Sequence, residues 1–118
     1  MTRKELKEEY KNIKFRAGVF QIRNLQNDRV FVEGSVNLDK IWNRHRVQLE
    51  AGNHPNTELQ QDWKRLGPDQ FAFEILGELT VDLQTDDELR KEVRLLEKMY
   101  KEELQPYGEK GYHSRPRY

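Results

Sequence analysis

The sequence contains no cysteine and no long apolar run. Without cysteine the chain can form no disulfide, no thiolate metal site and no thiol nucleophile. No apolar stretch approaches the ~20 residues that a membrane-spanning helix needs, and the charged first residues lack the apolar stretch of a secretory signal. These absences predict a cytoplasmic protein with no membrane partner.

The charge is balanced in total but uneven along the chain. The 118 residues are 36% charged and 35% hydrophobic, which predicts one domain with a compact core and a highly charged surface. Residues 1–46 hold 11 Lys and Arg against 6 Asp and Glu, and the remainder is acidic by the same margin. A basic half can bind phosphates although the whole chain is neutral. Ordinary solvated faces can segregate in the same way, and composition leaves both interpretations open.

Hydrophobic periodicity and turn residues predict an α+β fold, a small three-stranded antiparallel sheet flanked by helices. Asn37 and Gly52 are the expected caps of the first helix, and Thr85 with Glu88 is the capping box of the last. The predicted elements are strands at 15–23, 29–33 and 70–77 and helices at 37–51, 56–66 and 85–104. The predicted boundaries are a single domain over 1–118, a core at 15–113, a helix or arm at 1–14 and a surface coil at 105–118.

Aromatic side chains are expected to share the core. Trp42 and Trp63 fall on the inward faces of consecutive helices, and two phenylalanines alternate along the strand at 70–77. Both tryptophans and at least one of these phenylalanines are therefore expected to pack with Phe20 or Phe31.

Two short motifs in the predicted hairpin carry a resemblance to a known family. The first is Gly18-Val19-Phe20 and the second is Phe31-Val32-Glu33, followed by a helix that contains Trp42-Asn43-Arg44-His45. This order resembles the GIY-YIG nuclease family, in particular the catalytic domain of phage homing endonucleases, over residues 15–113. The resemblance implies an α+β domain that hydrolyses phosphodiester bonds with a divalent metal, Mg²⁺ or Mn²⁺.

The resemblance also implies that the active site is eroded. Two tyrosines and an arginine serve the chemistry in that family, and their positions fall on Phe20, Phe31 and Ile41. Phenylalanine lacks the hydroxyl and isoleucine lacks the charge, so these vestigial positions can neither accept a proton nor bind a phosphate. The glycine of the second motif falls on Glu33, which is either an added metal ligand or a solvated strand carboxylate. Since each catalytic group is typically worth ~10²–10⁴ in rate, we expect no measurable cleavage.

Four other residues match positions of the family's site. Glu97 matches the metal-binding glutamate and is the expected catalytic ligand for Mg²⁺ or Mn²⁺; a pair with Lys101 at i+4 is the alternative. His45 and His113 are further catalytic candidates, and His113 stands where the family has asparagine. The place of His45 on the apolar side of its helix favours a core histidine. His54 is expected to contact nucleic acid.

Three functions fit these observations. The first is a GIY-YIG domain that has lost catalysis and keeps a nucleic-acid-binding or regulatory role, with DNA contacts from Lys40, Arg44, Arg46 and His54. The second is an active metal-dependent endonuclease with rearranged groups. The third is a protein-interaction module, which salt-dependent DNA binding would exclude. The sequence makes no prediction about the oligomeric state.

Overall fold

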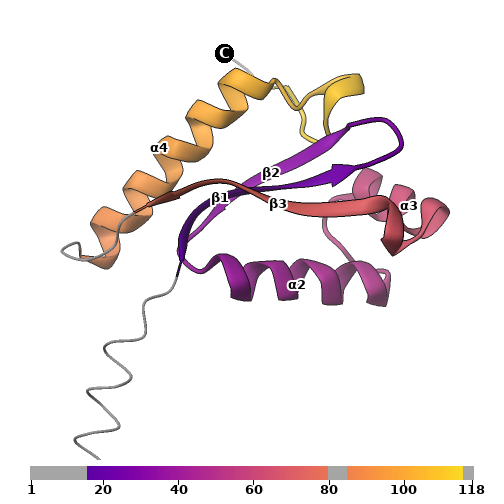
Figure 1. Cartoon of the computed structure of the whole chain (residues 1–118), viewed down its shortest axis with the longest axis horizontal. Helices are drawn as coiled ribbons and strands as arrows, with labels where there is room; N and C mark the ends of the chain where they lie inside the picture. Colours follow the sequence, from indigo (N-terminus) through magenta and orange to yellow (C-terminus); the bar gives the residue numbers. More distant parts are fainter. Residues whose placement is uncertain (1–15, 80–84, 116–118) are drawn as a thin grey trace, which may run out of the picture.

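The structure is a computed structural model that describes residues 16–79 and 85–115 (Figure 1). The arm expected at 1–14 lies outside the described residues. The elements, in chain order, are β1 (Ala17–Asn24), β2 (Val30–Ser35), α2 (Leu38–Ala51), α3 (Thr57–Leu66), the 3₁₀ turn η1 (Pro68–Gln70), β3 (Phe71–Leu79), α4 (Asp86–Leu104) and the 3₁₀ turn η2 (Gly108–Lys110). Within 16–79 and 85–115, no helix is long and apolar enough to cross a membrane.

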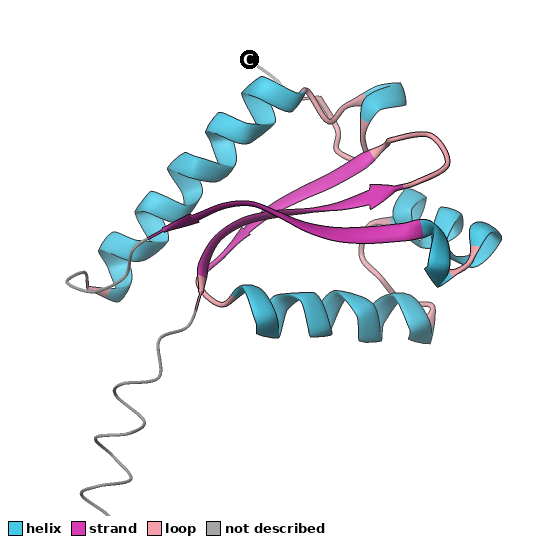
Figure 2. Ribbon diagram, viewed as in Figure 1, coloured by secondary structure: helices cyan, strands magenta, loops and turns pink. Residues whose placement is uncertain are grey.

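The three strands form one antiparallel sheet with β1 in the centre, in the order β2-β1-β3. Helix α4 lies across one face of this sheet, and α2 and α3 lie against the other (Figures 1 and 2). The predicted three-stranded sheet with flanking helices is confirmed. The sheet thus separates two apolar layers, and the two layers carry different candidate site residues.

The β1–β2 register decides which motif residues share a face. Phe20 lies opposite Glu33, and Ile22 lies opposite Phe31. Since side chains alternate along a strand, Phe20, Phe31 and Glu33 all face α2. Gly34 faces α4 instead, where an added Cβ would lie 2.6 Å from Cγ1 of Val93. Glu33, the last residue of the second motif, therefore lies on the α2 side of the sheet.

The aromatic core predicted from the sequence is confirmed on the α2 side of the sheet. The ring of Phe73 lies 5.0 Å from that of Phe20 and 4.6 Å from that of Trp42, between centroids. Trp63 packs at 5.2 Å from Phe71, and all five belong to one cluster. The α4 side has a smaller aliphatic layer built on Val19, Val30 and Val32, with Leu76, Leu96, Tyr100 and Leu104 against it.

The helix caps follow the sequence signals. The Asn37 side chain accepts from the Lys40 N–H, and Gly52 ends α2 at φ 80°. Thr85 and Glu88 form the predicted capping box at the start of α4. These local signals fix where α2 and α4 begin, and hence where the site residues of both helices lie.

The segment after α4 is part of the fold, and its prediction as a surface coil is wrong for residues 106–113. Pro106 and Tyr112 are buried, and the Tyr112 N–H donates to the Val30 carbonyl at 3.1 Å. The Tyr112 hydroxyl donates to Asp62 of α3 at 2.7 Å. This anchor joins residues 50 positions apart in the chain, so local sequence gives no sign of it.

Candidate functional site

The three histidines singled out from the sequence surround the ring of Phe31. His113 stacks on it with 4.9 Å between centroids, while His45 and His54 meet it edge-on at 5.3 and 5.7 Å. They come from the C-terminal segment, α2 and the α2–α3 connection. Phe31 is 8% exposed and Phe20 is fully buried. Both rings at the vestigial positions therefore belong to the core.

Glu33, His45 and His54 form a continuous hydrogen-bonded chain. Oε2 of Glu33 lies 2.5 Å from Nε2 of His45, and Nδ1 of His45 lies 2.7 Å from Nε2 of His54. Nδ1 of His54 accepts the backbone N–H of Asn56 at 3.0 Å. Glu33 is thus the hydrogen-bond partner of His45 rather than a free carboxylate.

This network assigns a tautomer to each ring, because each nitrogen can either donate or accept. Nδ1 of His54 accepts, so Nε2 of His54 carries the proton and donates to His45. Nδ1 of His45 accepts in turn, and Nε2 of His45 donates to Glu33. Burial, and then the neighbouring His45, lower the pKa of His54. In this arrangement neither ring has a lone pair left over.

Glu97 and His113 cap the outer edge of β2. Oε2 of Glu97 accepts the Gly34 N–H at 2.8 Å, and Oε1 accepts from Nζ of Lys101 at 2.9 Å. Nε2 of His113 accepts the Val32 N–H at 2.8 Å. An edge strand with free N–H groups invites pairing with other chains, and these two side chains satisfy two such groups. The pair with Lys101 that the sequence left as an alternative is present.

The environment of His113 keeps its ring neutral. Burial lowers the pKa of His113 to about 4, with a further contribution from the ammonium of Lys101 that outweighs the opposite effect of Glu97. Since Nε2 accepts from the backbone, the proton of the neutral ring sits on Nδ1. His113 can therefore donate a hydrogen bond at neutral pH, but it has no lone pair free to accept one.

A divalent metal in this class of reaction supplies Lewis-acid stabilisation of the phosphate. Among residues 16–79 and 85–115, no group of three or more His, Asp or Glu side chains is placed to hold a metal ion. Each oxygen of Glu97 accepts one hydrogen bond, from Lys101 or from a backbone N–H, and keeps a second lone pair that could ligate a metal ion. A single carboxylate fits a Mg²⁺ ion that keeps most of its water ligands, so Glu97 is the residue that would hold it.

Comparison with known proteins identifies the relatives of this chain. Over 64 residues it is 34% identical to intron-associated endonuclease 1 of Enterobacteria phage T4. The solved catalytic domain of the homing endonuclease I-TevI superposes with a TM-score of 0.64 and 29% identity, over 81% of this chain and 95% of that one. The chain is a homologue of the phage endonuclease, with the fold of a GIY-YIG nuclease domain. The predicted family resemblance is confirmed.

The matches cover only part of this chain and of its relatives. The aligned segment is 54% of this chain and 26% of the T4 protein, so the chain spans about a quarter of that relative's length. A solved point mutant of the I-TevI catalytic domain also superposes with a TM-score of 0.64, at 26% identity and over 77% of this chain and 86% of that one. A search of family models found no match.

In this homologue of the phage endonuclease, α2 presents two cations on the flank that also carries Ile41. Lys40 and Arg44 are exposed, and neither makes an ion pair with another described residue. Arg46 lies about 160° around the helix from Arg44, at ~100° per residue, and donates to Asn43. The three basic residues named from the sequence therefore do not form one face.

The prediction that His54 contacts nucleic acid is wrong for this structure. His54 is 6% exposed, and both of its ring nitrogens are hydrogen bonded to the protein. A buried ring with no free donor cannot reach a phosphate. The position matches the family, but the role here is to hold His45.

Sequence reasoning missed the buried cluster that anchors the C-terminal segment. Asp62 accepts from the Tyr112 hydroxyl at 2.7 Å and from Arg65 at 3.1 Å, and Arg29 lies 3.4 Å away. The guanidinium of Arg29 also stacks over the Tyr112 ring at 4.3 Å. Burial raises the pKa of Tyr112 to about 12. The cluster places the segment that carries His113.

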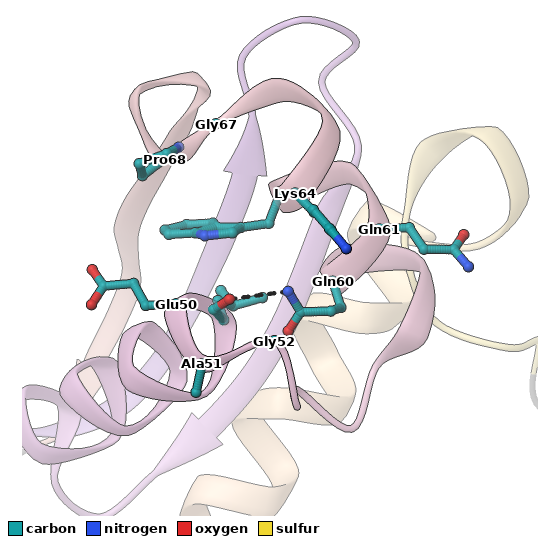
Figure 3. A pocket seen from close by; sticks show the side chains of 10 residues that line it. Glu50, Ala51, Gly52, Gln60, Gln61, Lys64, Gly67 and Pro68 are labelled. Atoms are coloured by element: carbon teal, nitrogen blue, oxygen red, sulfur yellow. Dashed lines mark hydrogen bonds between the residues drawn. The ribbon is translucent and has the colours of Figure 1, made fainter.

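A hollow of about 600 Å³ lies between the end of α2 and α3 (Figure 3). Its wall is fixed by Gln60, whose side chain donates to the Leu49 carbonyl at 3.0 Å. Glu50 and Lys64 also line it. None of the candidate site residues contributes to this hollow, so it has no part in the site.

Proposed function

We propose that this domain binds nucleic acid, and DNA in the first place, through the α2 flank of Lys40 and Arg44, and that it no longer cleaves it. The observation that carries the proposal is the closed hydrogen-bonded chain from Glu33 through His45 to His54. The missing hydroxyls at positions 20 and 31 and the missing cation at 41 support it independently.

Cleavage of a phosphodiester needs a base with a free lone pair close to the attacking water. In this site the acceptor nitrogens of His45, His54 and His113 are all occupied by protein donors. The carboxylate of Glu33, 36% exposed at its side chain, would also repel an approaching phosphate. The site therefore disfavours both the activation of the attacking water and the approach of the phosphate.

Nucleic-acid binding is better supported than cleavage, because two cations of α2 make no ion pair with a described residue. Arg16, Arg23 and Arg29 each pair with a carboxylate, whereas Lys40 and Arg44 pair with no described residue. Two phosphate contacts correspond to weak, non-specific binding, with a Kd on the order of 10⁻⁴–10⁻⁶ M near physiological salt.

Plasmid nicking tests the loss of catalysis. The native protein and Glu97→Ala are incubated with supercoiled plasmid and Mg²⁺ or Mn²⁺, and we expect no nicking by either. Metal-dependent nicking by the native protein that disappears in Glu97→Ala would refute the proposal and establish the rearranged endonuclease instead.

A restoration series tests the reason for the loss. Phe20→Tyr, Phe31→Tyr and Ile41→Arg together are expected to remain inactive while Glu33 holds His45. Adding Glu33→Gly is expected to yield metal-dependent nicking, because groups that act as a unit are strongly non-additive. Nicking by the triple variant with Glu33 in place would show that the hydrogen-bonded chain is not what blocks the chemistry.

Fluorescence anisotropy at several salt concentrations tests the binding surface. For duplex DNA, two phosphate contacts predict a log–log slope of about −1.8, and Lys40→Ala or Arg44→Ala should reduce it by about 1. Arg46→Ala removes the same charge from the other flank of the same helix and serves as the matched control. No binding at low salt would refute the proposal and favour a protein-interaction module.

A further inference from the structure

A cavity of about 380 Å³ opens where β2 passes into α2. It lies directly after Gly34, the residue bonded to Glu97. Its volume falls in the ~300–1,000 Å³ range of small-molecule sites. Its lining residues include the apolar Val36 and Ile41, the cations Lys40 and Arg44, and the amides Asn37 and Asn43.

The wall of this cavity is held by its own hydrogen bonds. The Ser35 hydroxyl accepts the Asn37 N–H and donates to the Asn37 carbonyl, both at 3.1 Å. The Asn37 amide oxygen accepts the Lys40 N–H at 3.1 Å. The cavity is therefore formed before any ligand arrives, which lowers the cost of binding.

The chemistry of the lining has three parts. Val36 is 39% exposed, and Ile41 extends the apolar wall towards the core. The amide oxygens of Asn37 and Asn43 are taken by protein donors, which leaves both NH₂ groups able to donate. Lys40 and Arg44 supply positive charge on the same flank.

We propose that this cavity binds one unstacked nucleotide of a single-stranded nucleic acid, its base against Val36 and Ile41 and its phosphate at Lys40 and Arg44. The inference rests on the proposed nucleic-acid binding and adds the form of the ligand. Apolar contact with a base face requires a base that is not paired in a duplex, while the base edge carries acceptors for the Asn37 and Asn43 amides.

This proposal gives the Ile41 side chain a role in binding. The family resemblance places a phosphate-binding arginine at this position, and isoleucine there removes that contact. The same isoleucine completes the apolar wall beside Val36. At position 41, a contact to a base then takes the place of a contact to the reacting phosphate.

The test compares three labelled 12-mers: oligo-dT, the same strand with abasic sites in place of every base, and a blunt duplex. Native protein should bind oligo-dT about tenfold more tightly than the abasic strand, because the base adds apolar contact with Val36 and Ile41, and more tightly than the duplex. Val36→Ser and Ile41→Thr should lower oligo-dT affinity to the abasic level. Val47→Ser changes an exposed valine on α2 outside the cavity, and it should bind like native protein.

The outcomes separate the two proposals. Salt-dependent binding that is equal for oligo-dT and the abasic strand overturns the nucleotide site and leaves nucleic-acid binding intact. No binding to any strand at low salt overturns both. If Ile41→Thr fails to fold, Val36→Ser at a partly exposed position decides the result, and native affinity for oligo-dT in that variant overturns the nucleotide site.

Discussion

The neutral histidines around Phe31 predict that the domain loses stability on mild acidification. Burial lowers the pKa of His113 from 6.5 to about 4 and lowers that of His54 from the same starting value. Above pH 6.5 neither the folded nor the unfolded chain carries these protons, so the full stability is present. Below pH 6.5 the unfolded chain binds protons that the folded chain does not, and stability falls with pH until the folded pKa is reached.

The magnitude follows from the shift at His113. A difference of 2.5 pKa units, from 6.5 to about 4, corresponds to at most about 3.5 kcal/mol at ~1.4 kcal/mol per unit. His113 keeps some contact with solvent, so we expect about half of this. Between pH 7.5 and 5, which avoids the titration of the carboxylates, about 1 kcal/mol should be lost through His113, with an addition of the same sign from His54.

Urea unfolding at a series of pH values measures this loss. With an m-value of ~1–3 kcal/mol/M for a small domain, the midpoint should fall by roughly 0.5 M or more between pH 7.5 and 5. His113→Gln keeps an acceptor for the Val32 N–H and cannot titrate, so its curve should be flatter than that of native protein. A native midpoint that stays constant or rises as pH falls would refute the assignment of neutral, buried rings.

Three further variants test the packing around the site, each by urea unfolding at pH 7. Phe31→Tyr places a hydroxyl among enclosed rings and should cost about 1–3 kcal/mol; an unchanged midpoint would mean that this side of the sheet is open to water. Asp62→Ala removes the acceptor of the Tyr112 hydroxyl, while Arg29 keeps Glu58 and the Gly111 carbonyl as partners, so the loss should be about 1–3 kcal/mol; an unchanged midpoint would show that the cluster does not anchor the C-terminal segment. Gly34→Ala forces a methyl group to within 2.6 Å of the Val93 side chain and should cost about 1–3 kcal/mol, and a neutral effect would place α4 farther from β2.

The parts of the fold that the sequence predicted are those with local causes. The caps at Asn37 and Thr85 depend on residues a few positions apart, and both are present. Alternate residues of β3, Phe71, Phe73 and Ile75, pack against one core cluster, as the sequence pattern predicts. The strand ends were less accurate, because β2 and β3 continue as far as their partner β1 pairs with them. Pairing length is a tertiary property that no short stretch encodes.

The site was predicted as a set of positions but not as a network. The resemblance located Glu97 and the three histidines, and the structure gathers the histidines around Phe31. Their hydrogen-bond partners could not be derived, because Glu33–His45 and His113–Val32 join separate elements. The place of His45 on the apolar side of α2 was a usable signal for a buried ring. No comparable feature of the sequence indicates that Tyr112 is the partner of Asp62.

The roles of Glu33, His45 and His54 are physically coupled. A carboxylate on the inner side of β2 loses much of its hydration and needs a donor, and His45 supplies one at 2.5 Å from the helix directly above it. His45 can donate to Glu33 only if its other nitrogen accepts, which requires the proton on Nε2 of His54. Once Glu33 is present, both histidines therefore gain a structural role that does not depend on catalysis. Histidines matching a nuclease site are thus, in this chain, no evidence that the nuclease activity remains.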